Sequence, residues 1–180
     1  MRYFDLKIFV AIILLGPAAM AQSSQDLLDR LSQSDSAVVS THLIDQIWQR
    51  WIGQAGNEEQ NRLMQQGLRE MNLAQYRQAE RTFDNLIALN PSYMEAWNKR
   101  ATVRFLLGDL NGSQEDINEV LMREPRHFGA LSGLGLINLQ RGDLENAIRA
   151  YEKVLSIDPF SPNALTFLPK LRTALDRSEL

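Results

Sequence analysis

The sequence contains no cysteine among its 180 residues. This absence excludes disulfide bonds, a thiol nucleophile and a lipid-modified cysteine anchor. Histidine is almost as scarce, since His42 and His127 are the only two and lie in separate regions of the chain. There is thus no histidine cluster for a metal ion, and no glycine-rich phosphate loop is present. We expect no catalytic residue, no metal site and no cofactor, and the sequence does not indicate an enzyme.

An excess of basic charge is also lacking. The chain has 19 lysine and arginine residues against 22 aspartate and glutamate residues, for a net charge of -3. Proteins that bind nucleic acid usually carry a basic surface, which this balance does not provide. We therefore expect no nucleic-acid partner, and the length favours one compact domain with a substantial core.

The only long apolar run lies near the N-terminus. Arg2 and Lys7 precede the run Ile8–Leu15, Gly16 and Pro17 break it, and an A-x-A sequence ends at Ala21. This layout is typical of a secretory signal peptide over residues 1–21, cleaved after Ala21. The run is too short to span a bilayer, so an uncleaved, permanent membrane anchor is the weaker alternative. The mature chain is predicted to be periplasmic or, as an alternative, secreted.

Three prolines, Pro91, Pro125 and Pro159, follow one another at intervals of 34 residues. When the units are aligned on these prolines, three further columns of residues keep the same spacing. They hold small residues at Gly67, Ala101 and Gly135, large apolar residues at Leu63, Trp97 and Leu131, and bulky residues at Phe83, Ile117 and Tyr151. A unit of this length is a helix-turn-helix that must stack on its neighbours to bury its apolar face. The small column lets the two helices of a unit approach closely.

This pattern resembles that of the tetratricopeptide repeat (TPR) family, with Leu63, Gly67, Tyr76, Ala79, Phe83 and Pro91 at the family's positions in the first unit. The resemblance implies an all-α fold, a right-handed α-solenoid of helix-turn-helix repeats with N- and C-terminal capping helices. The TPR domain is predicted over residues 58–180, with repeats at about 60–93, 94–127 and 128–161. Gly108 and Gly142 should end helices in a left-handed conformation, whereas Ala74 replaces glycine in the first unit.

The two ends of the domain are predicted to be capped by helices. A capping helix is expected over residues 162–176, with an apolar stripe of Leu165, Leu168, Leu171 and Leu175. An N-terminal helical cap is expected over residues 22–57, where Leu43, Ile44, Ile47, Trp48 and Trp51 share a face until Gly53. We expect Trp48 and Trp51 to pack against Leu63 and its neighbours, although an exposed, stacking tryptophan is an alternative.

In TPR proteins the first helix of each unit lines a concave groove, and the resemblance carries this role to three groups of residues. The predicted groove residues are Met64, Leu68 and Met71, then Asn98, Thr102 and Phe105, and then Ser132, Leu136 and Leu139. Met64 and Leu68 stand where the family's carboxylate-binding lysine and asparagine begin, so we expect no such clamp. The groove suits an amphipathic helix or an extended apolar peptide. Alternatively, about half of these residues pack only between helices.

The remaining charged residues are expected to face water. Glu115, Asp116 and Glu119 fall on the second helix of a unit, normally the convex side, and Arg77, Glu80, Arg81 and Asp84 look like solvated helix charges. Lys99 and Arg104 are candidates for the groove margin. His127, in a turn between units, is expected to have a surface or packing role.

Two hypotheses for the function remain. The first is an exported adaptor that binds a segment of a partner protein in its groove and helps to assemble an envelope complex. The second is a structural protein that self-associates as a homo-oligomer and whose own N-terminal helix fills the groove. Replacing Leu68 and Phe105 by charged residues would separate the two. The adaptor would stay folded and lose its partner, whereas the structural protein would lose stability or its oligomer.

Overall fold

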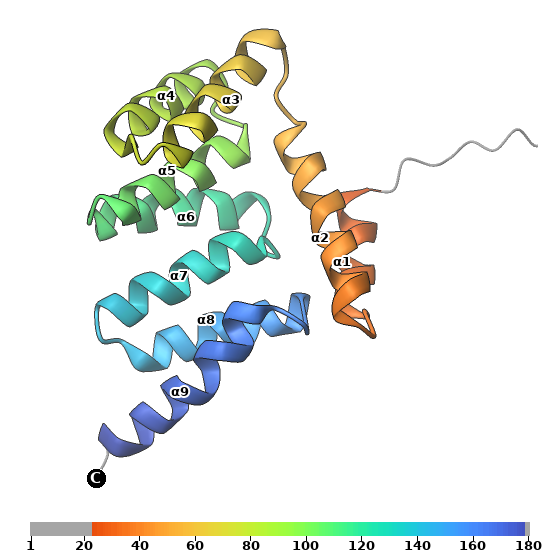
Figure 1. The fold of residues 1–180 in the computed structure, drawn as a ribbon, viewed down its shortest axis with the longest axis vertical. Coiled ribbons are helices and arrows are strands. Elements are labelled where there is room, and N and C mark those ends of the chain that lie inside the picture. The colour runs from red at the N-terminus through yellow and green to blue at the C-terminus, as the bar shows by residue number, and fades with distance from the viewer. Residues whose placement is uncertain (1–22, 179–180) are drawn as a thin grey trace, which may run out of the picture.

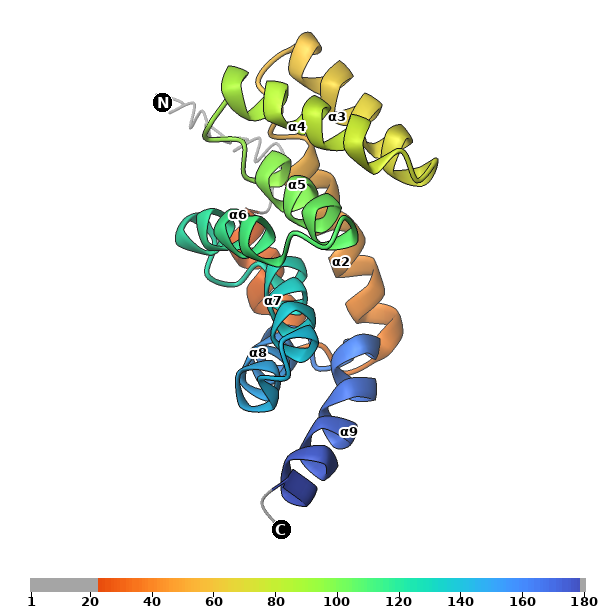
Figure 2. The ribbon, with the colours of Figure 1, turned by 90° about the vertical axis from the view of Figure 1, so that its left-hand side faces the viewer.

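The computed structural model describes residues 23–178, and every regular element in that span is an α-helix. This confirms the predicted fold class. The helices are α1 (Ser24–Ser32), α2 (Ala37–Ile52), α3 (Glu58–Asn72), α4 (Tyr76–Leu89), α5 (Met94–Leu106), α6 (Leu110–Arg123), α7 (Phe128–Gln140), α8 (Leu144–Ile157) and α9 (Pro162–Ser178). From α3 to α9 they follow one another along the long axis of the molecule as a helical solenoid (Figures 1 and 2). The predicted signal peptide lies outside the described residues.

Glycine lets the two helices of a pair lie close together. A Cβ atom on Gly67 of α3 would lie 2.5 Å from Cζ of Phe83 on α4. Gly135 of α7 has the same relation to Tyr151 of α8, whose Cε2 would be 2.8 Å away. These distances are shorter than non-bonded atoms tolerate, and both rings are fully buried. The structure therefore confirms the packing role predicted for the column of small residues.

The turns within the pairs follow the predicted chemistry. Gly108 and Gly142 have φ angles of 83° and 75°, a region that glycine enters without strain. The side chains of Asp109 and Asp143 then accept hydrogen bonds from the first turns of α6 and α8. Ala74 takes the corresponding place between α3 and α4 with a φ of 54°, which is strained for a residue with a Cβ atom.

The last helix covers the end of the solenoid, as predicted. Ala164, Leu168 and Leu171 of α9 are buried, and their spacing places them on one face of the helix. Leu165 was predicted to lie on this face but is 50 % exposed. The small Ala164 occupies the buried position instead, and this turns Leu165 towards solvent.

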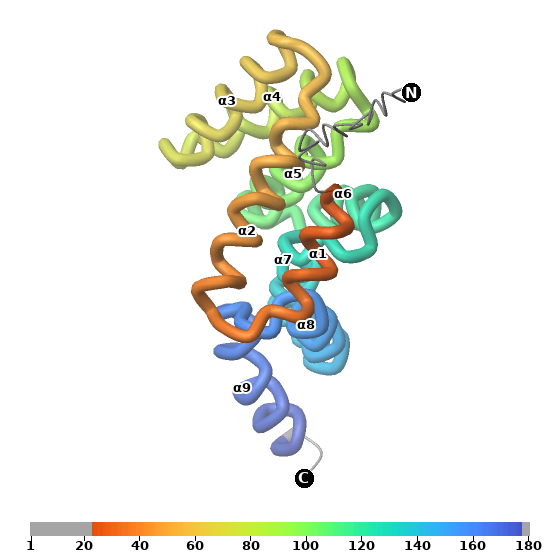
Figure 3. The backbone as a smooth tube through the Cα atoms, turned by 90° about the vertical axis from the view of Figure 1, so that its right-hand side faces the viewer, coloured from red at the N-terminus to blue at the C-terminus, as the bar shows by residue number. Residues whose placement is uncertain are grey.

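The helices α1 and α2 form an N-terminal hairpin (residues 24–52) that runs along one side of the stack (Figures 1 and 3). It crosses the turns that join one helix pair to the next. Six side chains anchor it, each at most 1 % exposed: Leu27, Leu28, Leu31, Leu43, Ile47 and Trp51. At about 25 cal/mol per Å² of apolar surface, this burial is a large share of the stability of a domain of this size.

The tryptophans of the hairpin lie elsewhere than predicted. Trp51 is buried and Trp48 is half-buried, so neither stands free on the surface. Their rings, however, contact His127 and Phe128 at the start of α7, with centroid distances of 4.1 to 5.5 Å, and not Leu63. The 34-residue period stops before the hairpin, and so it could not indicate where the hairpin docks.

Candidate functional site

An apolar pocket of about 150 Å³ lies on the inner side of the solenoid, between α5 and α7. It is comparable in volume to cavities that hold a benzene molecule. Its lining comes from three helices: Asn98, Ala101, Thr102 and Phe105 of α5, Ser113 and Ile117 of α6, and Gly129, Ala130, Ser132, Gly133 and Leu136 of α7. The hollow exists because most of these side chains are small. A Cβ atom on Gly133 would already lie 3.1 Å from Cδ1 of Ile117.

The predicted groove residues separate into two groups. The structure brings Asn98, Thr102, Phe105, Ser132 and Leu136 together around the pocket. The others lie outside it: Leu139 is half-buried and packs against the main core, Leu68 and Met71 are half-buried against the α3–α4 core, and Met64 is fully buried in that core. Met64 is therefore out of reach of a partner unless the core opens.

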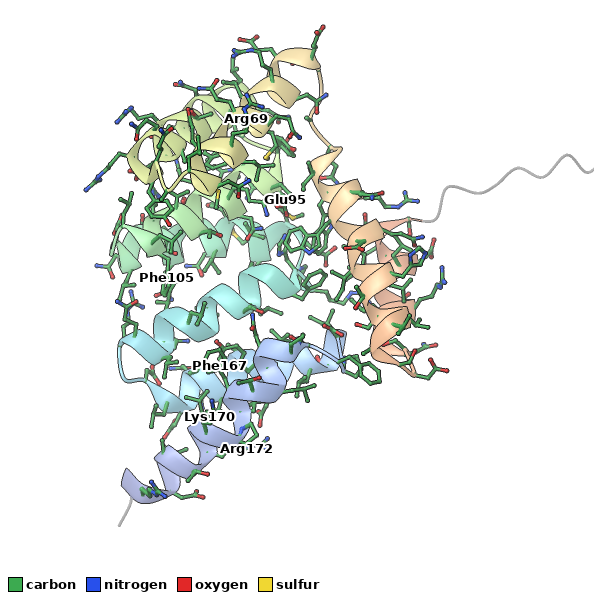
Figure 4. All side chains as sticks on the ribbon, in the orientation of Figure 1. Arg69, Glu95, Phe105, Phe167, Lys170 and Arg172 are labelled. Atoms are coloured by element: carbon green, nitrogen blue, oxygen red, sulfur yellow. The ribbon has the colours of Figure 1, made fainter. Side chains whose placement is uncertain are left out.

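A buried carboxylate and a buried imidazole meet beside the pocket. Glu95 of α5 and His127 both have side chains that are 0 % exposed, and Oε1 of Glu95 lies 2.6 Å from Nε2 of His127. The other ring nitrogen, Nδ1, accepts a hydrogen bond from the amide of Ala130 and caps α7. Nε2 therefore carries the proton that is donated to Glu95. Figure 4 shows Glu95 at the end of α5 that is next to α2, with Phe105 towards the other end.

The hairpin covers this buried pair. The ring of Trp51 stacks on His127, with a centroid distance of 4.1 Å and an interplanar angle of 13°. Lys99 completes the arrangement, because its Nζ atom lies 3.4 Å from Oε2 of Glu95 and 4.4 Å from the ring centre of Trp48. Lys99 was predicted at the groove margin, and it is instead held between the carboxylate and the hairpin.

These contacts set the ionisation of Glu95. Burial alone raises the pKa of a carboxyl group, but the hydrogen bond from His127, together with the charge of Lys99 and the hydrogen bond from Asn98, outweighs burial. The pKa of Glu95 therefore lies below its ordinary value of 4.5. Sequence reasoning missed this pair. The one available signal was that His127 stands 34 residues after Tyr93, directly before a repeat helix, where a capping side chain belongs.

A second ionic cluster ties α4, α5 and α6 together. Arg100 lies 2.7 Å from Asp84 and 2.6 Å from Asp116, and Arg104 lies 3.0 Å from Asp116 and 3.3 Å from Glu80. Asp116 is 1 % exposed, and burial raises its pKa despite the two arginines. The prediction of a solvated charge was therefore wrong for Asp116, whereas Glu80 and Asp84 are ion-paired and keep part of their side chains in solvent. The repeating pattern of small and apolar residues does not indicate which charged side chains meet, either within a unit or between neighbouring units.

In the part of the chain that the structure describes, no group of three or more metal-ligating side chains is assembled. Among the described helices, none is both long and apolar enough to cross a membrane. The pocket beside Asn98 is mostly apolar with a few polar groups, a composition that suits a binding site.

Comparison with known proteins identifies the fold. The family described as "Tetratricopeptide repeat" matches residues 64–113 and 107–162, which together cover more than half of the chain. The chain belongs to the TPR family. A TPR repeat-containing protein of Rhizobium etli is 47 % identical over 76 residues, which cover 42 % of this chain and 37 % of that protein. An FK506-binding protein-like protein of Mus musculus is 39 % identical over 59 residues, 33 % of this chain and 17 % of that protein.

This chain thus spans well under half the length of those relatives. Solved structures match over more of their own length. The first TPR domain of human RPAP3 has a TM-score of 0.62 and 24 % identity, and the match covers 65 % of this chain and 92 % of that one. MamA of Desulfovibrio magneticus RS-1 has a TM-score of 0.61 and 22 % identity, with 87 % and 88 % of the two chains covered. At these identities the likeness concerns the fold alone.

The ionisation of Glu95 leads to a prediction about acid stability. Because its pKa is lower in the folded chain than in the unfolded chain, Glu95 stabilises the fold above its ordinary pKa, and this contribution is lost as the pH falls through the folded value. We expect Glu95→Gln to lower the free energy of unfolding at neutral pH and to make its decline towards about pH 3 shallower than in the wild type. Urea denaturation over a pH series measures both effects.

The matched control for this experiment is Glu145→Gln, which removes a carboxylate from an exposed pair with Arg149. Surface pairs contribute little to stability, so this variant should follow the wild-type curve. If wild type and Glu95→Gln lost stability in parallel as the pH falls, Glu95 would not be the ionised, hydrogen-bonded group described above.

Proposed function

We propose that this protein binds a segment of another protein in its concave groove, with the pocket between α5 and α7 as the anchor point. The observation that carries the proposal is the pocket itself, a preformed apolar hollow lined by small residues and by Asn98 and Thr102. A hollow of this volume suits one large apolar side chain. Short apolar anchors set in grooves are a common way for helical domains to recognise peptides.

The alternative, in which the N-terminal helix fills the groove and the protein self-associates, receives less support. The lining of the pocket contains no residue of α1 or α2. Trp48 comes nearest, because its Cη2 would lie 2.8 Å from a Cβ atom on Gly129 at the edge of the pocket. The hairpin therefore packs next to Gly129 without lining the pocket, which leaves the pocket open to a partner.

A structural neighbour illustrates what the fold can do. The first TPR domain of Spaghetti (RPAP3), 24 % identical with a TM-score of 0.61, has been solved with the HSP90 peptide SRMEEVD. This supports a peptide-binding role for the groove but not the same ligand. In this chain Met64 and Leu68 stand where a carboxylate clamp would begin, and Met64 is buried. We propose an apolar partner segment in place of an acidic chain end.

The proposed setting is the bacterial envelope. It is supported by the basic residues, the apolar run Ile8–Leu15 and the A-x-A sequence ending at Ala21, which are typical of an export signal. In the periplasm an adaptor of this kind would help to assemble an envelope complex. We expect the intact mass of the chain isolated from an envelope fraction to correspond to cleavage after Ala21. A mass that still includes residues 1–21 would contradict cleavage.

The binding site is tested by Thr102→Arg. Thr102 is exposed and lines the pocket, so a long charged side chain there should block the entrance without disturbing the core. We expect the variant to stay folded and to lose partner binding by about tenfold or more, as for truncation of a central contact. The measurement is affinity capture from the envelope fraction with the mature chain as bait, followed by titration of each captured protein.

The control is Asn118→Arg, which adds the same charge at an exposed position of α6 that does not line the pocket. Proteins held by wild type and Asn118→Arg but not by Thr102→Arg are groove partners. Capture of the same proteins at the same strength by both variants would rule out the pocket as the binding site.

A further inference from the structure

The polar atoms that line the pocket indicate the conformation of the peptide segment that binds there. Asn98 lines the pocket and is only 6 % exposed, so its side-chain amide has little access to water. Its Nδ2 atom donates a hydrogen bond to Oε2 of Glu95 at 3.1 Å. Glu95 is in turn held by His127 at 2.6 Å and by Lys99 at 3.4 Å. The other polar atom of this side chain, Oδ1, is not among the fully buried atoms that lack a partner, so it is open to the pocket.

Glu95 fixes which end of the Asn98 amide faces the pocket. An ionised carboxylate can only accept hydrogen bonds, so the NH₂ group of Asn98 must face it. The pKa of Glu95, lowered as described, keeps the carboxylate ionised at neutral pH. The carbonyl oxygen Oδ1 therefore points away from Glu95, and no hydrogen bond to it is made within residues 23–178. Oδ1 is an acceptor without a donor.

The hydroxyl groups of the pocket are acceptors as well. Thr102 and Ser132 each donate to the main-chain carbonyl four residues earlier, at 3.1 and 2.8 Å. Ser113 donates to the carbonyl of Ala101 on the neighbouring helix at 2.8 Å. Their protons are thus used within the fold, and only oxygen lone pairs are left to face the pocket. A complementary ligand must bring an apolar group together with a hydrogen-bond donor.

We propose that the pocket binds an extended peptide segment, which places one large apolar side chain in the hollow and donates an adjacent main-chain N–H to Oδ1 of Asn98. This inference rests on the proposed function and narrows it. A helix interior cannot make the same contact, because its N–H groups already donate to carbonyls four residues earlier. An extended segment leaves its N–H groups free. A carboxylate ligand would bring only further acceptors.

Glu95 is then a positioning residue, which acts on the ligand through Asn98. In Glu95→Gln the new amide group can present either its oxygen or its NH₂ group to Asn98. The Asn98 amide is then free to turn over, and the pocket no longer presents a fixed acceptor. The shape of the pocket is unchanged, so the variant should still accept the apolar side chain.

Three blocked peptides test the inference on the mature full chain. The first is a flexible serine- and threonine-rich peptide with one central leucine, the second carries N-methyl-leucine at that place, and the third is a lactam-stapled helix with the same leucine exposed. Dissociation constants come from ¹⁵N-resolved NMR titrations. We expect the first to bind, N-methylation to weaken binding about fivefold, the net effect of one hydrogen bond, and the helix to bind more weakly than the first.

Two variants make the test specific to Asn98. In Asn98→Leu the new side chain is similar in size but has no hydrogen-bond acceptor. N-methylation of the peptide should therefore no longer change its dissociation constant. In Glu95→Gln the discrimination between the first two peptides should shrink while the leucine is still bound. Circular dichroism establishes that each variant is folded. The comparison of the three peptides on the wild-type protein remains decisive if either variant fails to fold.

The outcomes separate this inference from the proposed function. If N-methylation had no effect on the wild type, or if the helix bound as well as the extended peptide, the inference would be overturned, while loss of partner capture by Thr102→Arg would still support the groove as a binding site. If none of the peptides bound at millimolar concentrations, the inference would be overturned as well. If, in addition, Thr102→Arg still captured every partner that the wild type captures, the proposed function would be contradicted as well as the inference.

Discussion

The fold depends on one helix that touches three successive turns of the solenoid. Near its start α2 holds the turn before α9, where Ser40 donates to Asp158 at 2.6 Å. Further along, Trp51 stacks on His127 before α7, and the carbonyl of Ile52 accepts a hydrogen bond from Tyr93 before α5. With a rise of about 1.5 Å per residue, these contacts span roughly 18 Å of one rigid helix. A stack of repeats normally relies on contacts between neighbours, and here the hairpin adds a connection across several of them.

The buried carboxylates Glu95 and Asp116 are both paired, and that leaves the pocket between α5 and α7 with little charge of its own. Glu95 accepts hydrogen bonds from His127 and Asn98 and forms an ion pair with Lys99. Asp116 forms ion pairs with two arginines. Removing one partner of a buried ion pair leaves the other charge unpaired. This costs more free energy than the intact pair contributes to stability. The pocket beside them therefore offers apolar surface and a few directed acceptors. We expect such a pocket to discriminate between ligands by their shape and by the presence of a hydrogen-bond donor more than by their charge.

The period of 34 residues was enough to predict the helical solenoid, the close contact of Gly67 with Phe83, and the left-handed glycines Gly108 and Gly142, because each follows from a rule that repeats. The resemblance to TPR proteins also named Asn98 and Ser132 as groove residues, and the structure brings both to one pocket. The period could not place the hairpin, which lies outside it, or pair Glu95 with His127, since the two are 32 residues apart and meet only through stacking. The buried Asp116 was missed because the repeating pattern of small and apolar residues does not show which charged side chains pair, even within one unit.

The central claim is that hairpin and solenoid form one cooperative unit, locked at the Glu95–His127 pair. Amide hydrogen exchange of the folded chain tests it most directly, because it reports the free energy of opening at each residue. The account predicts the same opening free energy for the amides of Ile47 to Trp51 in α2 and for those near Leu131 in α7. Exchange in α2 that is orders of magnitude faster than in α7 would show that the hairpin opens independently and would contradict the account.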